Sequence, residues 1–343
     1  MHEYLISKRV LTLGLLACAL TSGFCQTSTP SSGKVANKPS PEVAWPTKPI
    51  RLLIGFPPGS VQDISARIIS EPLSKALGQP VIVENKAGAS GTVAADQVAK
   101  STDLHTFGVM NNSQMTIAKQ LNPSIAYDPA TDLAPIALIA TTPMVLVVSS
   151  AAVGSKSEDW MTWLRNLGEK GNYGSPGTGT PGHLGMELIK SRSGGLNTQH
   201  VPYQGNPQVI TAMLGGQLQA ALLPPGLAMQ QVRAGKMKAV GVTSDSRSIL
   251  AMELPTLRET GVLGAEVELF TALAGPASLP APIRDKLGAA LIDILKTNDV
   301  RQRLITAGWQ PTPSTAEGLR NRLRTETRNF GGIIMLRGIK SDS

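Results

Sequence analysis

The clearest pattern of apolar and polar positions is a short apolar run that leads directly into a helical repeat. The run over 52–56 predicts a buried strand, Pro57-Pro58-Gly59 ends it, and Ile64 and Ile68 then recur at helical spacing. A strand that turns into a helix leaves unpaired backbone N–H groups at the helix start, with the positive end of the helix dipole behind them. This segment therefore predicts a site for a small anion.

The same alternation continues along the chain. Strands are predicted over 79–85, 106–110, 144–148, 200–203, 220–223 and 239–242, with 266–274 running back. Helices are predicted over 93–100, 156–169, 183–193, 282–296, 299–306 and 315–330. Strands that alternate with helices indicate an α/β fold with parallel strands joined by crossovers.

The pattern also predicts two lobes. About 300 residues exceed the usual size of one core, and the strand, glycine loop and helix order repeats after residue 148. We expect lobe 1 to comprise 47–148 and 266–343, and lobe 2 to comprise 149–265. Because the chain then crosses twice between the lobes, the expected architecture is a hinged clam-shell, each lobe a sheet flanked by helices.

The first residues are typical of an export signal. Lys8 and Arg9 precede an apolar run over 10–20, and small residues at Gly23 and Cys25 fit cleavage after Cys25. We interpret 1–25 as a signal peptide that directs the protein to the periplasm; a lipid anchor on Cys18 is the alternative. Residues 26–46 are rich in Ser, Thr and Pro and predict a flexible tether.

Composition narrows the function classes. Both cysteines lie in the leader, which excludes disulfides, thiol catalysis and cysteine metal sites from the mature chain, and we expect no cofactor or metal. The formal net charge is +8, but the basic residues are scattered and only 4% of residues are aromatic. Such a surface attracts small anions and offers little for nucleic acid.

Three loops fall where ligands bind in α/β sheets, beyond the carboxyl ends of strands. These loops, at 57–62, 111–114 and 174–183, consist largely of Gly, Pro, Ser, Thr and Asn. They offer backbone N–H groups and neutral side-chain donors, and they contain no evident acid–base pair. We therefore expect a binding protein rather than an enzyme.

Several segments resemble the periplasmic receptors of tripartite tricarboxylate transporters, the Bug family. They include PTKPIRLLIGFPPG, LSKALGQPVIVENKAGASGT, YGSPGTGTPGHLGMELIK, HVPYQGNPQVITAMLGGQ and VRAGKMKAVGVTS, and the likeness runs in order from about residue 46 to the end. The resemblance implies a two-lobed receptor, a monomer in our expectation, that closes over a small organic carboxylate and delivers it to a membrane permease.

The resemblance also implies a binding site in which two loops grip the carboxylate, often through water. Position by position, it implicates Pro58, Gly59, Ser60, Val61, Asn112, Ser175, Gly177, Thr178, Gly179, Thr180 and His183. The family usually has a glycine-rich PGGxxD in the first loop, whereas this chain has Gly59-Ser60-Val61-Gln62-Asp63, so a β-branched side chain stands in the loop and we expect a narrower pocket. The stretch 222–226 lacks an acid that many relatives carry, which favours a plain mono- or dicarboxylate over an amino acid.

Each candidate residue also has a plainer interpretation. Ser60 and Asp63 have the spacing of a helix-capping box, and we favour that role for Asp63 because a carboxylate would repel an anionic ligand. His183 and Glu187 lie four apart, which favours a salt bridge or a capping histidine over half a metal site. If His183 lies at the cleft, it donates to the carboxylate and makes binding pH-dependent.

Other functions remain as alternatives. In one alternative, the same receptor serves a membrane sensor kinase instead of a permease, since both would contact an exposed rim. Ser175 faintly resembles a hydrolase nucleophile, but the surrounding residues lack the G-x-S-x-G spacing. The run 177–182 resembles a dinucleotide loop, yet no acid follows in the expected register.

Overall fold

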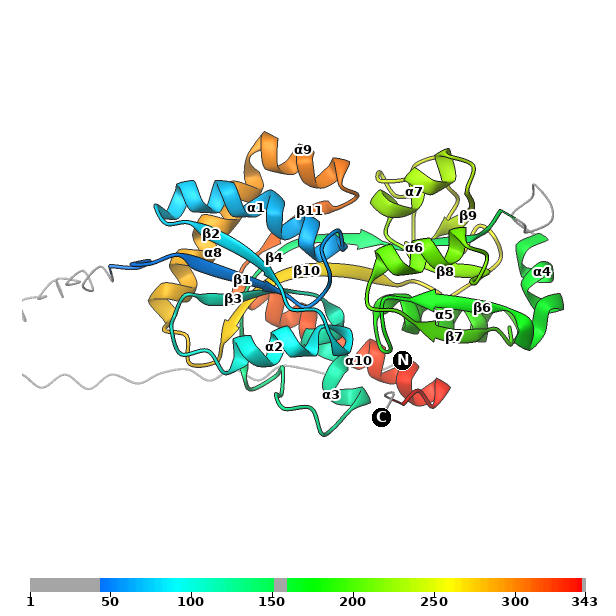
Figure 1. The fold of residues 1–343 in the computed structure, drawn as a ribbon, viewed down its shortest axis with the longest axis horizontal. Helices are drawn as coiled ribbons and strands as arrows, with labels where there is room; N and C mark the ends of the chain where they lie inside the picture. The colour runs from blue at the N-terminus through cyan, green and yellow to red at the C-terminus, as the bar shows by residue number, and fades with distance from the viewer. Residues whose placement is uncertain (1–43, 151–158, 341–343) are drawn as a thin grey trace, which may run out of the picture. The chain divides into compact units, whose positions relative to one another are not determined.

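The computed structural model describes residues 44–150 and 159–340, which form an α/β protein built on two mixed sheets flanked by helices (Figure 1). The predicted signal peptide, the Cys18 anchor and most of the predicted tether lie outside the described residues. None of the described helices is long and apolar enough to cross a membrane. The boundaries of the two lobes remain a prediction, and the elements of each sheet are given below.

The first sheet has the strand order β11-β4-β10-β3-β1-β2. Its strands are β1 (Ile50–Ile54), β2 (Val81–Asn85), β3 (Thr106–Met110), β4 (Leu133–Pro143), β10 (Glu268–Pro276) and β11 (Gln310–Ser314). Strands β2, β1 and β3 are parallel, as predicted, whereas β10 runs antiparallel to β3 and β4. Its helices are α1 (Val61–Leu77), α2 (Thr92–Ala99), α3 (Ala118–Leu121), α8 (Ala281–Lys296), α9 (Asn298–Thr306) and α10 (Ala316–Arg337).

Helices cover both faces of this sheet, which explains the continuous apolar run of β1. Leu52 and Ile54 point to the face covered by α1 and α8, whereas Leu53 packs on the opposite face with residues of α2 and α10. All three side chains are fully buried. A strand buried on both faces carries no polar alternation.

The second sheet has the strand order β7-β6-β8-β5-β9. Its strands are β5 (Val145–Ser149), β6 (Asn172–Ser175), β7 (Gln199–Pro202), β8 (Ala220–Leu223) and β9 (Met237–Val242). Strand β6 is parallel to β7 and β8, and β5 is antiparallel to β8 and β9. Its helices are α4 (Asp159–Leu167), α5 (Pro181–Arg192), α6 (Asn206–Leu214) and α7 (Pro225–Arg233).

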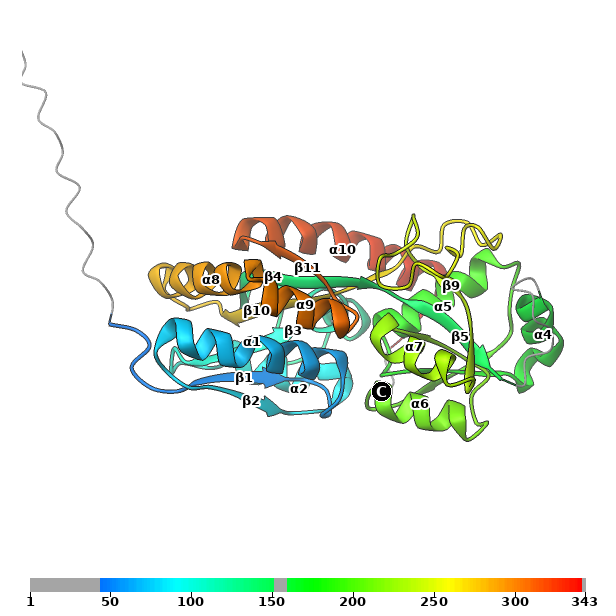
Figure 2. The same cartoon turned by 90° about the horizontal axis from the view of Figure 1, so that it is seen from above.

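The chain passes between the sheets at Met144, which joins β4 to β5, and again between β9 and β10. Thr243 ties the two crossings together. Its hydroxyl accepts the Met144 N–H at 2.8 Å and donates to the Val267 carbonyl, and its own N–H bonds the Met144 carbonyl at 2.9 Å. The C-terminal part of α10 adds a further link (Figure 2), because Arg337 pairs with Glu187 of α5 at 2.9 Å.

The lobes also touch on both sides of these crossings. The side chain of Ser90 donates to the Thr178 carbonyl at 2.8 Å. On the other side, the backbone of Gly226 at the start of α7 lies against the turn of Ala307 and Gly308, so closely that neither glycine has room for a β-carbon. The two lobes are therefore in contact on both sides of the crossings.

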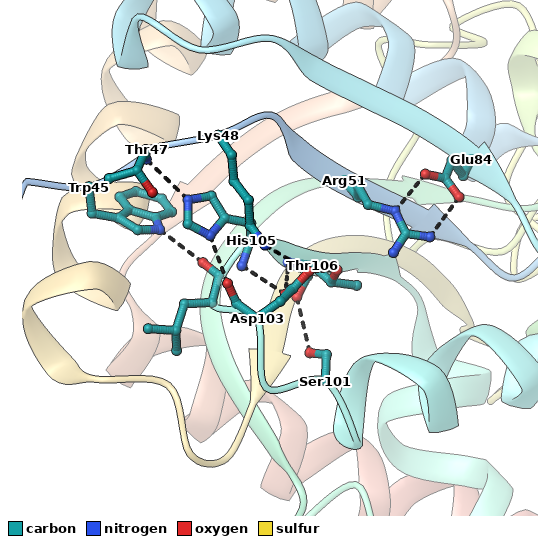
Figure 3. Close-up of polar contacts among 10 residues, drawn as sticks. Trp45, Thr47, Lys48, Arg51, Glu84, Ser101, Asp103, His105 and Thr106 are labelled. Carbon is teal, nitrogen blue, oxygen red and sulfur yellow. Dashed lines mark hydrogen bonds and ion pairs between the residues drawn. The ribbon is translucent and has the colours of Figure 1, made fainter.

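The start of the described chain is fixed to lobe 1 (Figure 3). Trp45, which falls in the predicted tether, is 4% exposed, and its indole N–H donates to the Leu104 carbonyl at 2.9 Å. The Asp103 carboxylate orders the next turn by accepting the backbone N–H groups of His105 and Thr106 at 3.0 and 2.9 Å. The last residues of the predicted tether range are thus packed on the sheet.

Candidate functional site

The loop after β1 ends in a side-chain cap. Ser60 is the N-cap of α1, and its hydroxyl accepts the Asp63 N–H at 3.4 Å. The Asp63 carboxylate accepts the Gly59 N–H at 2.9 Å, one residue before the N-cap that a capping box would use. The capping interpretation of these two residues is confirmed, with that one-residue difference.

The negative charge of Asp63 is balanced by an ion pair and hydrogen bonds. Its carboxylate also pairs with Arg67 at 2.9 Å and accepts a hydrogen bond from Asn85 at 3.0 Å. Burial alone would raise the pKa of Asp63, but the bonds from Arg67, the Gly59 N–H and Asn85 outweigh it and hold that pKa below its usual value. The Asp63 carboxylate therefore remains charged, and its oxygens are bonded by the Gly59 N–H, Arg67 and Asn85.

The glycine loop between β6 and α5 has a backbone that needs its glycines. Gly177 and Gly179 have φ of 130° and 76°, in the region that favours glycine. The Thr180 hydroxyl donates to the Gly177 carbonyl at 2.7 Å and holds the turn before Pro181 starts the helix. The first turn of α5 lines the same cavity as the first turn of α1.

A third helix start joins them. Helix α6 begins at Asn206, directly after the loop that follows β7, with Pro207 in its first turn. Asn206 is only 4% exposed, and its side-chain oxygen has no hydrogen-bond partner among the described residues. Since the oxygen and nitrogen of an amide side chain are interchangeable by rotation, Asn206 can equally present an N–H donor.

These three helix starts enclose a cavity of about 20 Å³ between the lobes. Its wall consists of Phe56, Ser60, Val61, Gln62, Asn111, Met144, Pro176, Thr180, Pro181, Gly182, Asn206 and Leu269. We call this cavity the cage. None of its lining residues is charged, and its volume admits about one water molecule. The first N–H groups of a helix have no intrahelical acceptor, so helix starts at a cavity favour an anion there.

A second, larger cavity adjoins the cage. It has a volume of about 530 Å³ and lies between 88–92, 113–125, 177–179 and 202–208. We call it the groove. Three segments contribute to both cavities: Asn111 lines the cage and Ser113 the groove, Asn206 lines the cage and Gln208 the groove, and the glycine loop supplies Pro176 and Thr180 to the cage and 177–179 to the groove.

The sequence-predicted site residues separate into four groups. Ser60, Val61 and Thr180 line the cage. Gly177, Thr178 and Gly179 line the groove. Pro58 and Gly59 are exposed on the first loop. Ser175, His183 and Asn112 are buried and line neither cavity. No comparison tests these roles, so the site assignment remains a prediction.

Asn112 is fully occupied by structural bonds. Its amide nitrogen donates to the Glu268 carbonyl at 3.2 Å and to the Glu326 carboxylate at 3.0 Å, and its oxygen accepts the Phe270 N–H at 3.0 Å. Asn112 thereby joins the turn after β3 to β10 and α10. Its neighbour Asn111 is the residue that reaches the cage.

His183 supports the glycine loop from behind. Its Nδ1 accepts the Gly179 N–H at 3.0 Å, and its ring stacks on His200 with centroids 3.8 Å apart. Burial lowers the pKa of His183 to about 4. Of the two plainer interpretations, the structure favours the cap, because Glu187 instead bonds Tyr173, Lys190 and Arg337.

Ser175 has a histidine neighbour that the sequence did not reveal. Its hydroxyl lies 2.7 Å from His200 Nε2, the pairing that a serine hydrolase uses. However, Ser175 is fully buried, and its hydroxyl also bonds the Gly177 carbonyl at 2.9 Å. The pair braces the loop and opens to neither cavity.

Gln62 and Asn111 lie in loops that were predicted to face a ligand but were not among the candidate residues, whereas Asn206 lies outside those loops. Asn206 carried a usable signal: the order strand, Gly205, Asn206 and Pro207 has the small-residue turn and early proline that start a helix. Read that way, the segment would have supplied a third helix start beside the two that were predicted.

Comparisons with known proteins agree with this architecture. A family model described as the tripartite tricarboxylate transporter family receptor matches residues 65–339. A UPF0065 protein of Bordetella pertussis is 31% identical over 297 residues, covering 86% of this chain and 91% of the relative.

Two solved structures share the fold at similar identity. The periplasmic binding protein BugD superimposes with a TM-score of 0.82 at 26% identity, covering 87% of this chain and 100% of the other. A Rhodopseudomonas palustris protein with adipate superimposes with a TM-score of 0.83 at 26% identity, covering 87% and 99%.

Proposed function

This chain belongs to the tripartite tricarboxylate transporter receptor family, and on that premise we propose that it is a solute receptor that binds a small organic carboxylate between its two lobes. Members of this family are periplasmic substrate-binding proteins, and we place this chain in the same compartment. Delivery of the ligand to a membrane permease is part of the proposal.

The observation that carries the proposal is the convergence of three helix starts on one enclosed cavity. Helices α1, α5 and α6 supply the N-cap or first-turn residues Ser60, Thr180 and Asn206 to the cage. An anion is stabilised there by oriented N–H groups whose dipoles are fixed before it arrives. A carboxylate is electrostatically complementary to these N–H groups, whereas a cation is not.

The size of the cage indicates how the carboxylate is held. A volume of about 20 Å³ suits one water molecule and is too small for a whole carboxylate. We infer that the carboxylate lies at the edge of the cage and is bonded partly through a water inside it. Hydrogen bonds to a charged group contribute roughly 1.5–3 kcal/mol each, so a few of them reach about −8 kcal/mol, a micromolar Kd.

A thermal-shift panel of mono- and dicarboxylates tests the proposal. At least one carboxylate should raise the melting temperature in a saturable way, because it binds only the folded protein. Asn206→Ala should weaken that ligand at least tenfold. Asn197→Ala, an exposed asparagine in the same lobe, is the matched control and should leave the Kd unchanged. If no carboxylate shifts the melting temperature of the native protein, the proposal is wrong.

A further inference from the structure

The groove beside the cage differs from it in chemistry. Of its 17 lining residues, none is Asp, Glu, Lys, Arg or His. One wall consists of Ile117, Ala118, Leu121 and Ile125, with Tyr203 opposite from lobe 2. Eight lining residues carry polar but uncharged side chains: Ser90, Thr92, Ser113, Asn122, Thr178, Tyr203, Gln204 and Gln208. A concave surface of this size with an apolar wall and neutral polar groups is typical of a small-molecule site.

Some backbone donors around the groove are bonded within the protein. The Gly91 N–H, beside the groove-lining Ser90, bonds the Gly88 carbonyl at 2.8 Å, the Ser113 N–H bonds Asn111 Oδ1 at 3.0 Å, and the Gly179 N–H bonds His183 Nδ1 at 3.0 Å. A second carboxylate placed in the groove would find only neutral donors and no cation among the lining side chains, so its desolvation would be only partly compensated.

Two buried polar atoms without a hydrogen-bond partner among the described residues nevertheless belong to the groove lining: Gln208 Oε1 and the Ser113 hydroxyl. Ser113 is 2% exposed. A buried hydroxyl without a partner is unfavourable unless a ligand or water satisfies it. Ser113 therefore marks the position of one polar contact in a site that is otherwise apolar or neutral.

We propose that the groove is the subsite for the rest of the ligand, and that this receptor selects monocarboxylates with an uncharged, mainly apolar tail over dicarboxylates. The inference rests on the proposed function, because the cage must hold the carboxylate while the tail lies along Ile117, Leu121 and Ile125. This selectivity would differ from that of the structural neighbour, which was solved with adipate, a dicarboxylate.

Titration calorimetry with sodium hexanoate and sodium adipate tests the inference, since the two ligands have six carbons each and differ only at the far end. Hexanoate should bind at least tenfold more tightly than adipate. From butanoate to hexanoate, each added methylene should improve the Kd by about fourfold. Equal binding, or tighter binding of adipate, would overturn the subsite while leaving the carboxylate receptor intact. If neither these ligands nor any other carboxylate binds, the proposed function fails and the subsite fails with it.

Two variants test the location. Ile125→Lys adds a cation to a partly exposed position in the groove wall and should reverse the preference toward adipate. Ala118→Leu fills the groove and should weaken hexanoate at least tenfold without changing the Kd of propanoate, whose tail is too short to reach it. If Ala118→Leu weakened both ligands equally, or neither, the tail would lie elsewhere. This second variant decides the question even if the first does not fold.

Discussion

At the scale of single residues, Val61 has two roles, one through its backbone and one through its side chain. Its carbonyl accepts the Trp309 indole N–H at 3.3 Å, and its side chain, 2% exposed, forms part of the cage wall. The first role fixes the loop, and the second limits the space beside the carboxylate. A glycine at this position would keep the carbonyl contact and remove the wall.

We expect Val61→Ala to admit carboxylates that are branched next to the carboxylate group. Two methyl groups leave the cage wall, while the backbone contact to Trp309 remains. Calorimetry should show the Kd of 2-methylpropanoate improving relative to that of propanoate, whereas Ile82→Ala, on an exposed edge strand, should leave the ratio unchanged. An unchanged ratio in Val61→Ala would show that this side chain does not limit the ligand.

His183 should make folding stability depend on pH. The pKa of His183 is about 4 in the folded protein, against an ordinary value of 6.5. Below pH 6.5, the unfolded chain therefore binds a proton on this residue, whereas the folded chain does not. Stability therefore falls as the pH falls, by about 2 kcal/mol between pH 7 and pH 5. Urea denaturation at the two pH values measures the loss. In His183→Gln this part of the loss should disappear; an identical loss in the variant would assign it to other groups.

At the scale of elements, the hinge depends on a side chain rather than on the strands alone. Strands β4 and β5 are separated only by Met144, and the backbone groups of that residue find their partners on Thr243. The Thr243 hydroxyl also reaches Val267 on the returning segment. One hydroxyl thus satisfies buried polar groups from both crossings.

Thr243→Val should destabilise the protein by about 1–3 kcal/mol, because the Met144 N–H and the Val267 carbonyl would be left buried without partners. The change keeps the shape of the side chain and removes only the hydroxyl. Thr211→Val is the control, since Thr211 is exposed and bonds its own helix. Equal urea midpoints for the two variants would contradict this role for Thr243.

The elements that the sequence predicted and those it missed differ for a physical reason. Strand β3 lies over 106–110 as predicted, because polar turns bound its apolar run on both sides. Strand β4 was missed because the apolar run from 133 to 149 passes through the hinge without a turn, so local pattern cannot divide it between sheets. Helix α6 was missed, although Pro207 marks its first turn, because no side chain caps its start.

The candidate site shows the same limit. Ser60 and Thr180 could be predicted as helix starts from their own neighbours in sequence. Their meeting point could not, because it depends on how the two lobes close, and so the sequence could not distinguish Asn111, which lines the cage, from Asn112, which bonds β10 and α10. The stack of His183 on His200 likewise joins residues from α5 and β7.

At the scale of the whole molecule, closure requires a close backbone contact far from the ligand. Gly226 of α7 meets the turn of Ala307 and Gly308, and a β-carbon on Gly226 would overlap the Ala307 carbonyl oxygen. Both partners are backbone, so neither can rotate aside. We therefore expect this backbone contact to limit how far the lobes can close.

Gly226→Ala should hold the lobes partly open. Alanine is favourable in the first turn of a helix, so the thermal stability without ligand should be unchanged or slightly higher, while the Kd for the carboxylate should rise at least tenfold. Small-angle X-ray scattering should show a larger radius of gyration in the presence of ligand than for the native protein. Gly332→Ala, where an added β-carbon meets nothing within 4 Å, should behave as the native protein does.

The uncharged wall of the cage has a consequence for the conditions under which the receptor works. Amide side chains and helix backbones carry no ionisable proton across the ordinary pH range, and a buried site is little screened by salt. For the carboxylate that we propose, the dissociation constant should therefore be nearly constant from low to high ionic strength and at every pH at which the ligand itself is ionised and the protein is folded. The fraction of receptor that is occupied would then depend on the ligand concentration alone.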